Sequence, residues 1–343
     1  MPLYYLLVFI ATILLSVIFT RLVKFLAGKL GIVDKPDHPR KIHQTNTPLL
    51  GGLAIFLAFF MMLYFLHDKL LSGNLEPRHW QGFFIGACFL IVGGFFDDKY
   101  NLKPLKQFIF PLLASLSVII GGVEIEKITN PWGGYIYLGW LSGLIIMIWL
   151  LGMMYTTKLL DGLDGLVTGV SAIGALIIFL FTMTTKYYQP DIGLAALVLA
   201  AACLGFLIFN WYPAKIFLGE GGSLLLGFIL GVLAIISGGK IAIALLVMGI
   251  PIMDVIWTII RRLAAGKNPF KFADQKHLHF RLLNFGLGQR KTVLIYYIFA
   301  AVFGLSALFL QSQGKLLALL VLAIIMLVVV MAFTLLDKGS RVV

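Results

Sequence analysis

The sequence predicts an all-α protein that crosses a membrane about eleven times, and three observations support this prediction. Its 343 residues are 60% hydrophobic and only 12% charged, and their mean hydropathy is +1.00. A soluble domain carries about twice that charged fraction. Eleven apolar runs approach the roughly 20 residues that a helix needs to cross a bilayer. Lys and Arg are also distributed very unequally between alternate loops, as in multi-pass membrane proteins.

The apolar runs leave no room for a separate soluble domain, so a single membrane domain over residues 1–343 is expected. Because only residues 237–240 divide the stretch from 222 to 262, ten helices remain an alternative. Residues 124–138 contain turn formers between alternating Ile and Tyr, which predicts a small hairpin on one membrane surface. The runs cover 3–27, 49–67, 81–97, 105–122, 139–158, 165–185, 191–209, 222–237, 240–262, 292–311 and 315–336.

The basic residues predict the orientation in the membrane. Of the 27 Lys and Arg residues, 21 fall in the loops after odd-numbered runs and in the C-terminal tail, and the other 6 fall on the opposite side. The positive-inside rule makes the first side cytoplasmic, with the N-terminus outside and the C-terminus inside. Loss of one span would break this alternation, which favours eleven helices over ten.

The acidic residues gather on the same side, which the positive-inside rule does not require. Ten of the 15 Asp and Glu residues lie there, several at the ends of the runs. A carboxylate at membrane depth costs a few kcal/mol, so it usually has a partner and a purpose. We therefore expect a chemical site on the cytoplasmic face, built from the loops 28–48, 98–104, 158–165, 210–222 and 263–291.

The first of these loops carries a cluster of phosphate-binding side chains. Arg40, Lys41 and His43 lie within four residues, and their donors suit a phosphate group. A basic loop that only sets the topology is the alternative.

The second loop begins with two adjacent carboxylates, Asp97 and Asp98, followed by basic residues that include Lys106. Adjacent carboxylates repel each other unless a divalent cation or a lysine neutralises them. Such a pair suits a magnesium diphosphate site, or a base that takes a proton from a phosphate monoester. A solvated helix end is the alternative.

The third loop combines Lys158, Asp161 and Asp164 at spacings of three. On a continuous helix these side chains would share one face. Gly162 and Gly165 would permit a tight turn instead.

The fourth loop surrounds one carboxylate, Glu220, with glycines, whose backbone amides could cradle an anion. Phe217 could stack on a base ring and Asn210 could recognise its polar edge. An ordinary turn with interfacial aromatic residues is the alternative.

The fifth loop contains His277, His279 and Arg281. Phosphate binding by these side chains is favoured over a zinc site, because no Cys or third His lies nearby. Asp254, inside the preceding run and after Pro251, either pairs with a Lys or Arg of another span or fixes a kink.

Taken in order, these motifs resemble those of the polyprenyl-phosphate N-acetylhexosamine-1-phosphate transferases, the family of WecA, TagO and MraY. The resemblance runs from about residue 20 to 295. Most of it, including the eleven-span plan, is nearer to the WecA and TagO branch, whereas the His-x-His-Phe ending is nearer to MraY. The motifs are Asp-Lys-Pro, Arg-Lys-Ile-His, Thr-Pro-x-x-Gly-Gly, Asp-Asp-x-Tyr-x-Leu, Asp-Gly-Leu-Asp-Gly, Pro-Ala-Lys-Ile-Phe-x-Gly-acid-x-Gly-Ser and His-Leu-His.

The resemblance implies an enzyme of the bacterial inner membrane whose active site faces the cytoplasm. It would transfer an N-acetylhexosamine 1-phosphate, most closely GlcNAc 1-phosphate, from a UDP-sugar to undecaprenyl phosphate. UMP would leave, and the product would start a cell-envelope glycan. Mg²⁺, with Mn²⁺ as an alternative, would stabilise the developing negative charge. Membrane lipid is a further expected partner, nucleic acid is not, and a homodimer is left open.

The resemblance also implies roles for individual residues. Asp97 or Asp98 would be the base for the lipid phosphate, and Asp161 and Asp164 would organise the diphosphate and, with Glu220, the metal. Uracil would be held by Gly162, Leu163, Asn210 and Phe217. The remaining substrate-binding residues would be Arg40, Lys41, His43, Lys106, His277, His279 and Arg281.

Two positions depart from the family pattern on either side of the metal. The family usually has Asn at the position of Lys158 and Asp at the position of Glu220. Lys158 could pair with Glu220 and put an ammonium group where Mg²⁺ would sit. Alternatively, Lys158 points elsewhere and Glu220 still binds the metal. Retained metal binding is preferred slightly, because the other acids still need neutralising.

Three other functions remain to be weighed. The first is an MraY-type transferase that uses a peptidyl sugar. The second is a catalytically impaired homologue that binds the lipid carrier or the nucleotide sugar, which Lys158 would favour. The third is a transporter, but its charges would gather near the bilayer midplane and not at one face.

Overall fold

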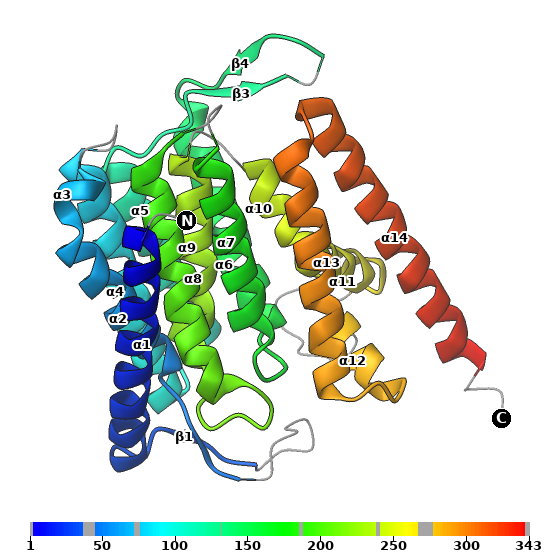
Figure 1. Cartoon of the computed structure of the whole chain (residues 1–343). Coiled ribbons are helices and arrows are strands. Elements are labelled where there is room, and N and C mark those ends of the chain that lie inside the picture. The colour runs from blue at the N-terminus through cyan, green and yellow to red at the C-terminus, as the bar shows by residue number, and fades with distance from the viewer. Residues whose placement is uncertain are drawn as a thin grey trace.

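The chain folds into a bundle of long helices with two short two-stranded antiparallel sheets (Figure 1). This computed structural model describes residues 3–36, 45–71, 76–130, 132–184, 188–237, 241–266 and 277–339, with side chains up to residue 333. The all-α prediction is therefore confirmed.

The first half of the chain forms α1 to α6 and all four strands. Its elements are α1 (Leu3–Lys29), β1 (Val33–Asp34), β2 (Thr47–Pro48), α2 (Gly51–Phe65), α3 (His67–Leu70), α4 (Pro77–Tyr100), α5 (Pro104–Ile120), β3 (Lys127–Thr129), β4 (Tyr135–Tyr137) and α6 (Leu141–Leu160). In the described part of the second half, all the regular elements are helices. Its elements are α7 (Leu166–Thr182), α8 (Pro190–Asn210), α9 (Gly219–Ile236), α10 (Ile241–Val247), α11 (Gly249–Ala264), α12 (Leu278–Asn284), α13 (Gln289–Phe309) and α14 (Ser312–Gly339).

Seven of these helices are long and apolar enough to cross a membrane, namely α1, α4, α6, α8, α9, α13 and the Ser312–Phe333 part of α14. An eighth candidate span is the pair α10 and α11, which meet at an angle of 79°. The helices α2, α5 and α7 are apolar but shorter. The described chain is thus a multi-pass membrane protein with seven to eight candidate spans. Each of the eleven predicted runs lies on one of these helices or on the bent pair, but the count of eleven stays a prediction.

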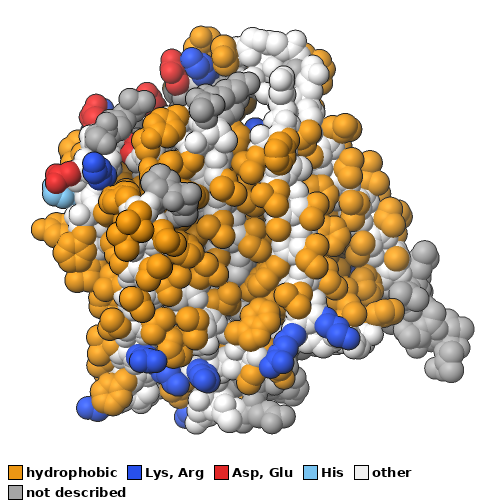
Figure 2. Space-filling view, viewed as in Figure 1, with side chains coloured by type: hydrophobic (Ala, Val, Ile, Leu, Met, Phe, Trp, Pro, Cys, Tyr) orange, Lys and Arg blue, Asp and Glu red, His pale blue; other side chains and the backbone are white. Residues whose placement is uncertain are grey.

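Burial separates the centre of the bundle from its lipid-facing surface. The apolar windows of α8 and α9 are 78% and 89% buried, whereas those of α1 and α14 are 28% and 17% buried. Leu317 and Ile324 of α14 are more than half exposed. Figure 2 shows a broad hydrophobic surface with Lys and Arg along its lower edge. Such a surface is stable only where lipid replaces water as the solvent.

Glycines allow the start of α9 to pack closely between α2 and α4. A Cβ added at Gly52 would collide with the backbone of Gly222, and one added at Gly94 would collide with the backbone of Gly221. Small residues let helix backbones approach this closely. The contacts hold the first turn of α9, which carries Glu220, beside the end of α4, which carries Asp98.

The two ends of the bundle differ. At one end, β3 and β4 form an antiparallel hairpin in which Ile128 pairs with Ile136, so the predicted hairpin is confirmed. The turns after α6 and α8 lie at the opposite end, together with β1 and α12 (Figure 1). That end is the one at which the sequence predicts the chemical site.

Candidate active site

A cavity of about 670 Å³ lies at this end of the bundle, where five parts of the chain converge. It is lined by backbone and side chains of the turns after α4, α6 and α8 and by the start of α9. The predicted site residues that line it are Asp97, Asp98, Asp161, Gly162, Leu163, Asp164, Asn210, Phe217 and Glu220. Asp34, Thr45 and Thr47 of the first predicted loop and Phe280 and Gln289 of the fifth also line it. The tertiary fold therefore brings together residues of all five predicted loops.

The adjacent carboxylates at the end of α4 have different surroundings. Asp97 Oδ1 accepts hydrogen bonds from the backbone N–H of Leu102, at 2.9 Å, and from the side-chain amide of Gln107 on α5, at 2.8 Å. Asp98 Oδ1 accepts a hydrogen bond from the backbone N–H of Glu220, at 3.0 Å. The other oxygen of Asp98 lies so close to Gly219 that an added Cβ would collide with it, and Gly219 has a φ of +73°. Only glycine adopts that conformation readily.

Asp161 and Asp164 lie on the turn between α6 and α7, so the tight-turn alternative is the correct one. Asp164 Oδ2 accepts a hydrogen bond from the backbone N–H of Ala214 at 2.9 Å, which ties this turn to the loop after α8. Asp161 faces the cavity among the other carboxylates. Reduced solvation by the surrounding protein raises the pKa of Asp161 to about 8, and the negative charges of Glu220, Asp98 and Asp164 add to this effect.

Asn210, at the end of α8, holds the loop that carries Phe217. Its Oδ1 accepts a hydrogen bond from Thr168 Oγ1 at 2.8 Å, and its Nδ2 donates to the carbonyl oxygen of Ile216 at 3.0 Å. Thr168 lies within the apolar helix α7 and carries no sequence signal that predicts its role. The amide of Asn210 therefore orients this loop, and Phe217 lines the cavity.

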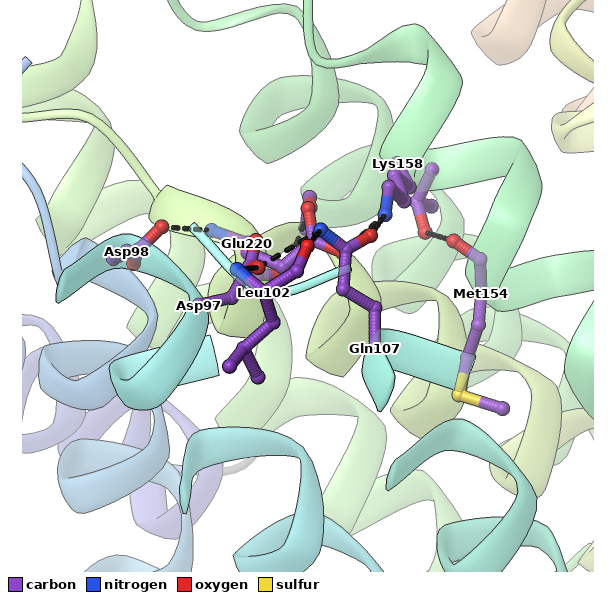
Figure 3. Close-up of polar contacts among 9 residues, drawn as sticks. Asp97, Asp98, Leu102, Gln107, Met154, Lys158 and Glu220 are labelled. Atoms are coloured by element: carbon purple, nitrogen blue, oxygen red, sulfur yellow. Dashed lines mark hydrogen bonds and ion pairs between the residues drawn. The ribbon is translucent and has the colours of Figure 1, made fainter. Parts of the chain in front are cut away.

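Lys158, in the last turn of α6, points at the start of α9. Its Nζ forms an ion pair with the carboxylate of Glu220 and donates a hydrogen bond to Gln107 Oε1 at 3.2 Å (Figure 3). Gln107 Nε2 in turn donates to Asp97 Oδ1 at 2.8 Å. The sequence analysis singled out Lys106, which is exposed on α5 and is not among the residues that line the described cavity. The residue after it, Gln107, makes the contacts.

The two histidines form a buried pair behind the cavity. His277 Nδ1 lies 2.8 Å from Asp254 Oδ2, and the backbone N–H of Leu278 donates to Asp254 Oδ1 at 3.0 Å. The rings of His277 and His279 stack, with centroids 5.7 Å apart. Among the described residues, Asp254 has His277 and Leu278 as hydrogen-bond partners, and a pairing with Lys or Arg stays a prediction. Asp254 holds the start of α12 through His277, and the 79° bend lies ahead of it, between α10 and α11.

His279 touches the cavity wall from behind. Its Nε2 would lie 2.5 Å from a Cβ added at Gly162. Burial is the main reason that the pKa of His279 is lowered to about 4; the negative charge of Asp254 opposes this effect, and the neighbouring His277 adds to it. His277, His279 and Arg281 do not line the described cavity. Their substrate contacts stay a prediction, and the predicted residues Arg40, Lys41 and His43 lie outside the described residues.

The predicted metal ligands Glu220, Asp161 and Asp164 do not form a ready metal site. Within the described ranges, no three His, Cys, Asp or Glu side chains are grouped closely enough to hold a metal ion. The carboxylate of Glu220 is already bound by the ammonium group of Lys158. The side chains present therefore do not fit a resident divalent cation, and the structure favours the Lys158–Glu220 pairing over the alternative that the sequence analysis preferred.

Residues 80–238, which run from α4 to the end of α9, match the family described as "Glycosyl transferase family 4". The chain is 34% identical to the "Probable undecaprenyl-phosphate N-acetylglucosaminyl 1-phosphate transferase" of Bacillus subtilis, over 93% of this chain and 88% of that protein. It is 31% identical to the "Decaprenyl-phosphate N-acetylglucosaminephosphotransferase" of Mycobacterium tuberculosis, over 83% and 77%. It is 30% identical to the "Phospho-N-acetylmuramoyl-pentapeptide-transferase" of Halalkalibacterium halodurans, over 88% and 95%.

The matched region contains α4, α6, α8 and α9, whose ends and turns line the cavity, whereas Phe280 of α12 and Gln289 of α13 lie beyond it. The similarity to the Bacillus subtilis relative covers 93% of the chain and so extends to both flanks of the matched region. The chain therefore belongs to glycosyl transferase family 4, in the branch of the polyprenyl-phosphate N-acetylglucosamine-1-phosphate transferases.

Proposed function

We propose that this protein transfers N-acetylglucosamine 1-phosphate from UDP-N-acetylglucosamine to undecaprenyl phosphate and releases UMP. The reaction takes place at the cytoplasmic face of a bacterial inner membrane and starts a cell-envelope glycan. Relatives named for this type of transfer share most of their length with the chain, which supports the proposal.

The position of Asp98 is the observation that carries the proposal. Asp98 lines the polar cavity and also an apolar groove of about 310 Å³. The groove is formed by α2, α4 and the start of α9, and its walls include Leu53, Val92 and Phe96. A lipid phosphate needs such a boundary, because its isoprenoid chain requires an apolar surface while its phosphate must meet a polar nucleotide sugar.

The chemistry follows from this placement. Asp98 accepts the proton of the lipid phosphate, and the freed oxygen attacks the β-phosphorus of the nucleotide sugar. A new P–O bond joins the lipid phosphate to the sugar phosphate, while the bond from the β-phosphorus to the bridging oxygen breaks and UMP leaves with that electron pair. Asp97 is engaged by Leu102 and Gln107 and serves to shape the turn. We therefore assign the base to Asp98.

The nucleotide end of the donor lies at the other side of the cavity in this proposal. Phe217 offers an aromatic face for the uracil ring, and Gly162 and Leu163 form the adjoining wall. Asn210 orients the loop that carries Phe217. The sequence motif assigns Arg40, Lys41 and His43, which lie outside the described residues, to binding of the phosphates.

We propose eleven membrane crossings, made by the seven long helices, the bent pair α10 and α11, and the shorter α2, α5 and α7. An odd number of crossings puts the two termini on opposite sides, and the excess of Lys and Arg in the loops after odd-numbered runs then puts the N-terminus outside and the C-terminus in the cytoplasm. The turns around the cavity lie at the same end as the lower band of Lys and Arg in Figure 2, which supports a cytoplasmic active site. All five catalytic loops then belong to one domain.

A radiolabel-transfer assay tests the function. Purified protein in detergent is given undecaprenyl phosphate and, in parallel, labelled UDP-GlcNAc, UDP-GalNAc, UDP-glucose and UDP-MurNAc-pentapeptide. We expect label from UDP-GlcNAc to enter the lipid phase, together with stoichiometric UMP. Absence of labelled lipid from every donor, in protein that is monodisperse and folded, would contradict the proposal and favour a homologue that only binds the lipid carrier or the nucleotide sugar.

The similarity to a phospho-N-acetylmuramoyl-pentapeptide-transferase over 88% of the chain makes the MraY-type reaction the second candidate. The same assay separates the two functions, because that reaction would label the lipid from the peptidyl donor alone.

A further inference from the structure

Lys158 forms an ion pair with the carboxylate of Glu220, one of the predicted metal ligands. Its side chain is 24% exposed, and that of Glu220 is 16% exposed. The pair lies at the cavity, since Glu220 lines it. A lysine that is only solvated at a helix end would not be partly buried against an acid from a distant helix.

The surroundings of Lys158 are built to hold a cation. Gln107 Nε2 donates to Asp97 Oδ1 and to the carbonyl oxygen of Leu102, at 2.8 and 2.9 Å. These bonds turn Oε1 of Gln107 toward the ammonium group, at 3.2 Å. If the amide were flipped, its N–H donors would face the ammonium group of Lys158, which has only donors, and no hydrogen bond could form. Elements α4, α5, α6 and α9 thus cooperate to place oxygen atoms around one positive charge (Figure 3).

The same oxygen atoms are of the kind that Mg²⁺ and Mn²⁺ bind. Enzymes of this family generally depend on a divalent metal ion. A divalent cation bound to Glu220 would have to displace the ammonium group or sit beside it, and two positive groups within contact distance repel each other. The ammonium group and a metal ion therefore compete for one position.

We propose that the ammonium group of Lys158 takes the place of a divalent cation, so that this enzyme transfers its sugar phosphate without one. The inference rests on the proposed function. Lysine has a flexible four-carbon stem, so Nζ can turn from Glu220 toward the diphosphate when the donor binds. It then stabilises the negative charge that gathers on the departing UMP phosphate. The bonds made and broken are those given above, and Lys158 keeps its proton throughout.

Two measurements test the proposal, and only the first depends on turnover. The first is the rate of lipid labelling after exhaustive EDTA treatment, with and without added Mg²⁺. The second is the binding of Mn²⁺, measured by the loss of the free-ion signal in electron paramagnetic resonance. Both are made on the wild-type protein, on Lys158→Asn/Glu220→Asp and on the control Lys127→Asn. The control lysine lies on the exposed β3 hairpin at the opposite end of the bundle.

We expect the wild-type protein and the control to keep their rate in EDTA within about twofold and to bind no stoichiometric Mn²⁺. The double variant removes the ammonium group and retains oxygen ligands. It should bind about one Mn²⁺, and its labelling rate in EDTA should be at least about tenfold lower than its rate with Mg²⁺. This is the size of effect expected for an electrostatic group at a reacting phosphate.

The proposal is overturned if the wild-type protein binds one Mn²⁺ tightly and loses its activity in EDTA until Mg²⁺ returns. That result would leave the proposed function intact. If no donor labels the lipid under any condition, the proposed function fails and metal-free transfer fails with it, while the Mn²⁺ measurement still decides whether Lys158 occupies the position of the cation. Should the double variant not fold, the wild-type result decides by itself.

Discussion

Asp97 and Asp98 show how two neighbouring residues of the same type acquire different roles. Successive residues on a helix do not face the same way. Asp97 therefore turns toward α5, where Leu102 and Gln107 satisfy it, and Asp98 turns toward Gly219 and the start of α9. The sequence could not separate the two, because the packing of α9 against α4 decides which of them meets the groove.

This difference makes Asp98→Asn a test of the base. Asparagine keeps the shape and can still accept the hydrogen bond from Glu220, but it cannot take a proton. We expect the labelling rate to fall by about 10²- to 10⁴-fold, with little change in the thermal stability of the protein in detergent. The matched control is Asp68→Asn, whose carboxylate is highly exposed far from the cavity. Retention of more than about a tenth of the rate in Asp98→Asn would exclude this role.

His279 makes the folded state sensitive to acid. Its pKa is lowered to about 4 in the folded protein, against an ordinary value of 6.5, so the folded state binds this proton more weakly than the unfolded state does. The resulting stability is fully present above about pH 6.5 and is lost as the pH falls toward 4.

We expect His279→Phe, which keeps an aromatic ring beside His277 and Phe280, to flatten the fall of the melting temperature between pH 7 and pH 5. Differential scanning fluorimetry of the two proteins in detergent measures this. The exposed residue His67 provides the control, and His67→Phe should leave the slope unchanged. An unchanged slope in His279→Phe would mean that another group governs the acid sensitivity.

At the scale of elements, the glycines around the start of α9 have a measurable role. Gly94 of α4 has no room for a Cβ because the backbone of Gly221 occupies that space, whereas Gly152 of α6 has nothing within 4 Å. Both lie within helices, so their intrinsic preference for alanine is similar.

We expect Gly94→Ala to lower the free energy of unfolding by about 1–3 kcal/mol through overpacking, and also to lower the labelling rate, because α9 carries Glu220. Gly152→Ala should be neutral or stabilising by up to about 1 kcal/mol. Thermal denaturation and the transfer assay on both variants provide the comparison. Equal stability of the two variants would show that α9 can shift away from α4 without cost.

The elements themselves follow well from local sequence. Each predicted apolar run coincides with a helix or with the bent pair, and the 124–138 hairpin forms as expected. The stretch from Lys158 to Asp164 was left open between helix and turn. It resolves as the end of α6 followed by a turn, in which Gly165 adopts a φ of +77° and Asp164 accepts a hydrogen bond from Ala214 of the loop after α8.

At the scale of the whole molecule, the orientation can be measured by cysteine labelling. Lys127 on β3 and Lys215 in the loop after α8 are both exposed and lie at opposite ends of the bundle. In intact cells, a membrane-impermeant maleimide should label Lys127→Cys, and it should reach Lys215→Cys only after permeabilisation. The native Cys203 is buried and Cys88 is half-buried, so the wild-type protein gives the background. The reverse pattern would contradict the proposed orientation.

The sequence by itself determined that this is a helical membrane protein, and its motifs placed it in its family. Both properties are written in local features, since apolar length and the order of motifs do not depend on how helices pack. Tertiary structure alone decided that Asp98, and not Asp97, reaches the groove, and that Lys158 binds Glu220. It also decided that Gln107 and Thr168 support the site and that Asp254 holds His277. These contacts join residues 10 to 62 positions apart. Their geometry depends on how distant helices pack, such as the close approach of α9 to α2 and α4 that places Glu220, and no local pattern specifies this packing.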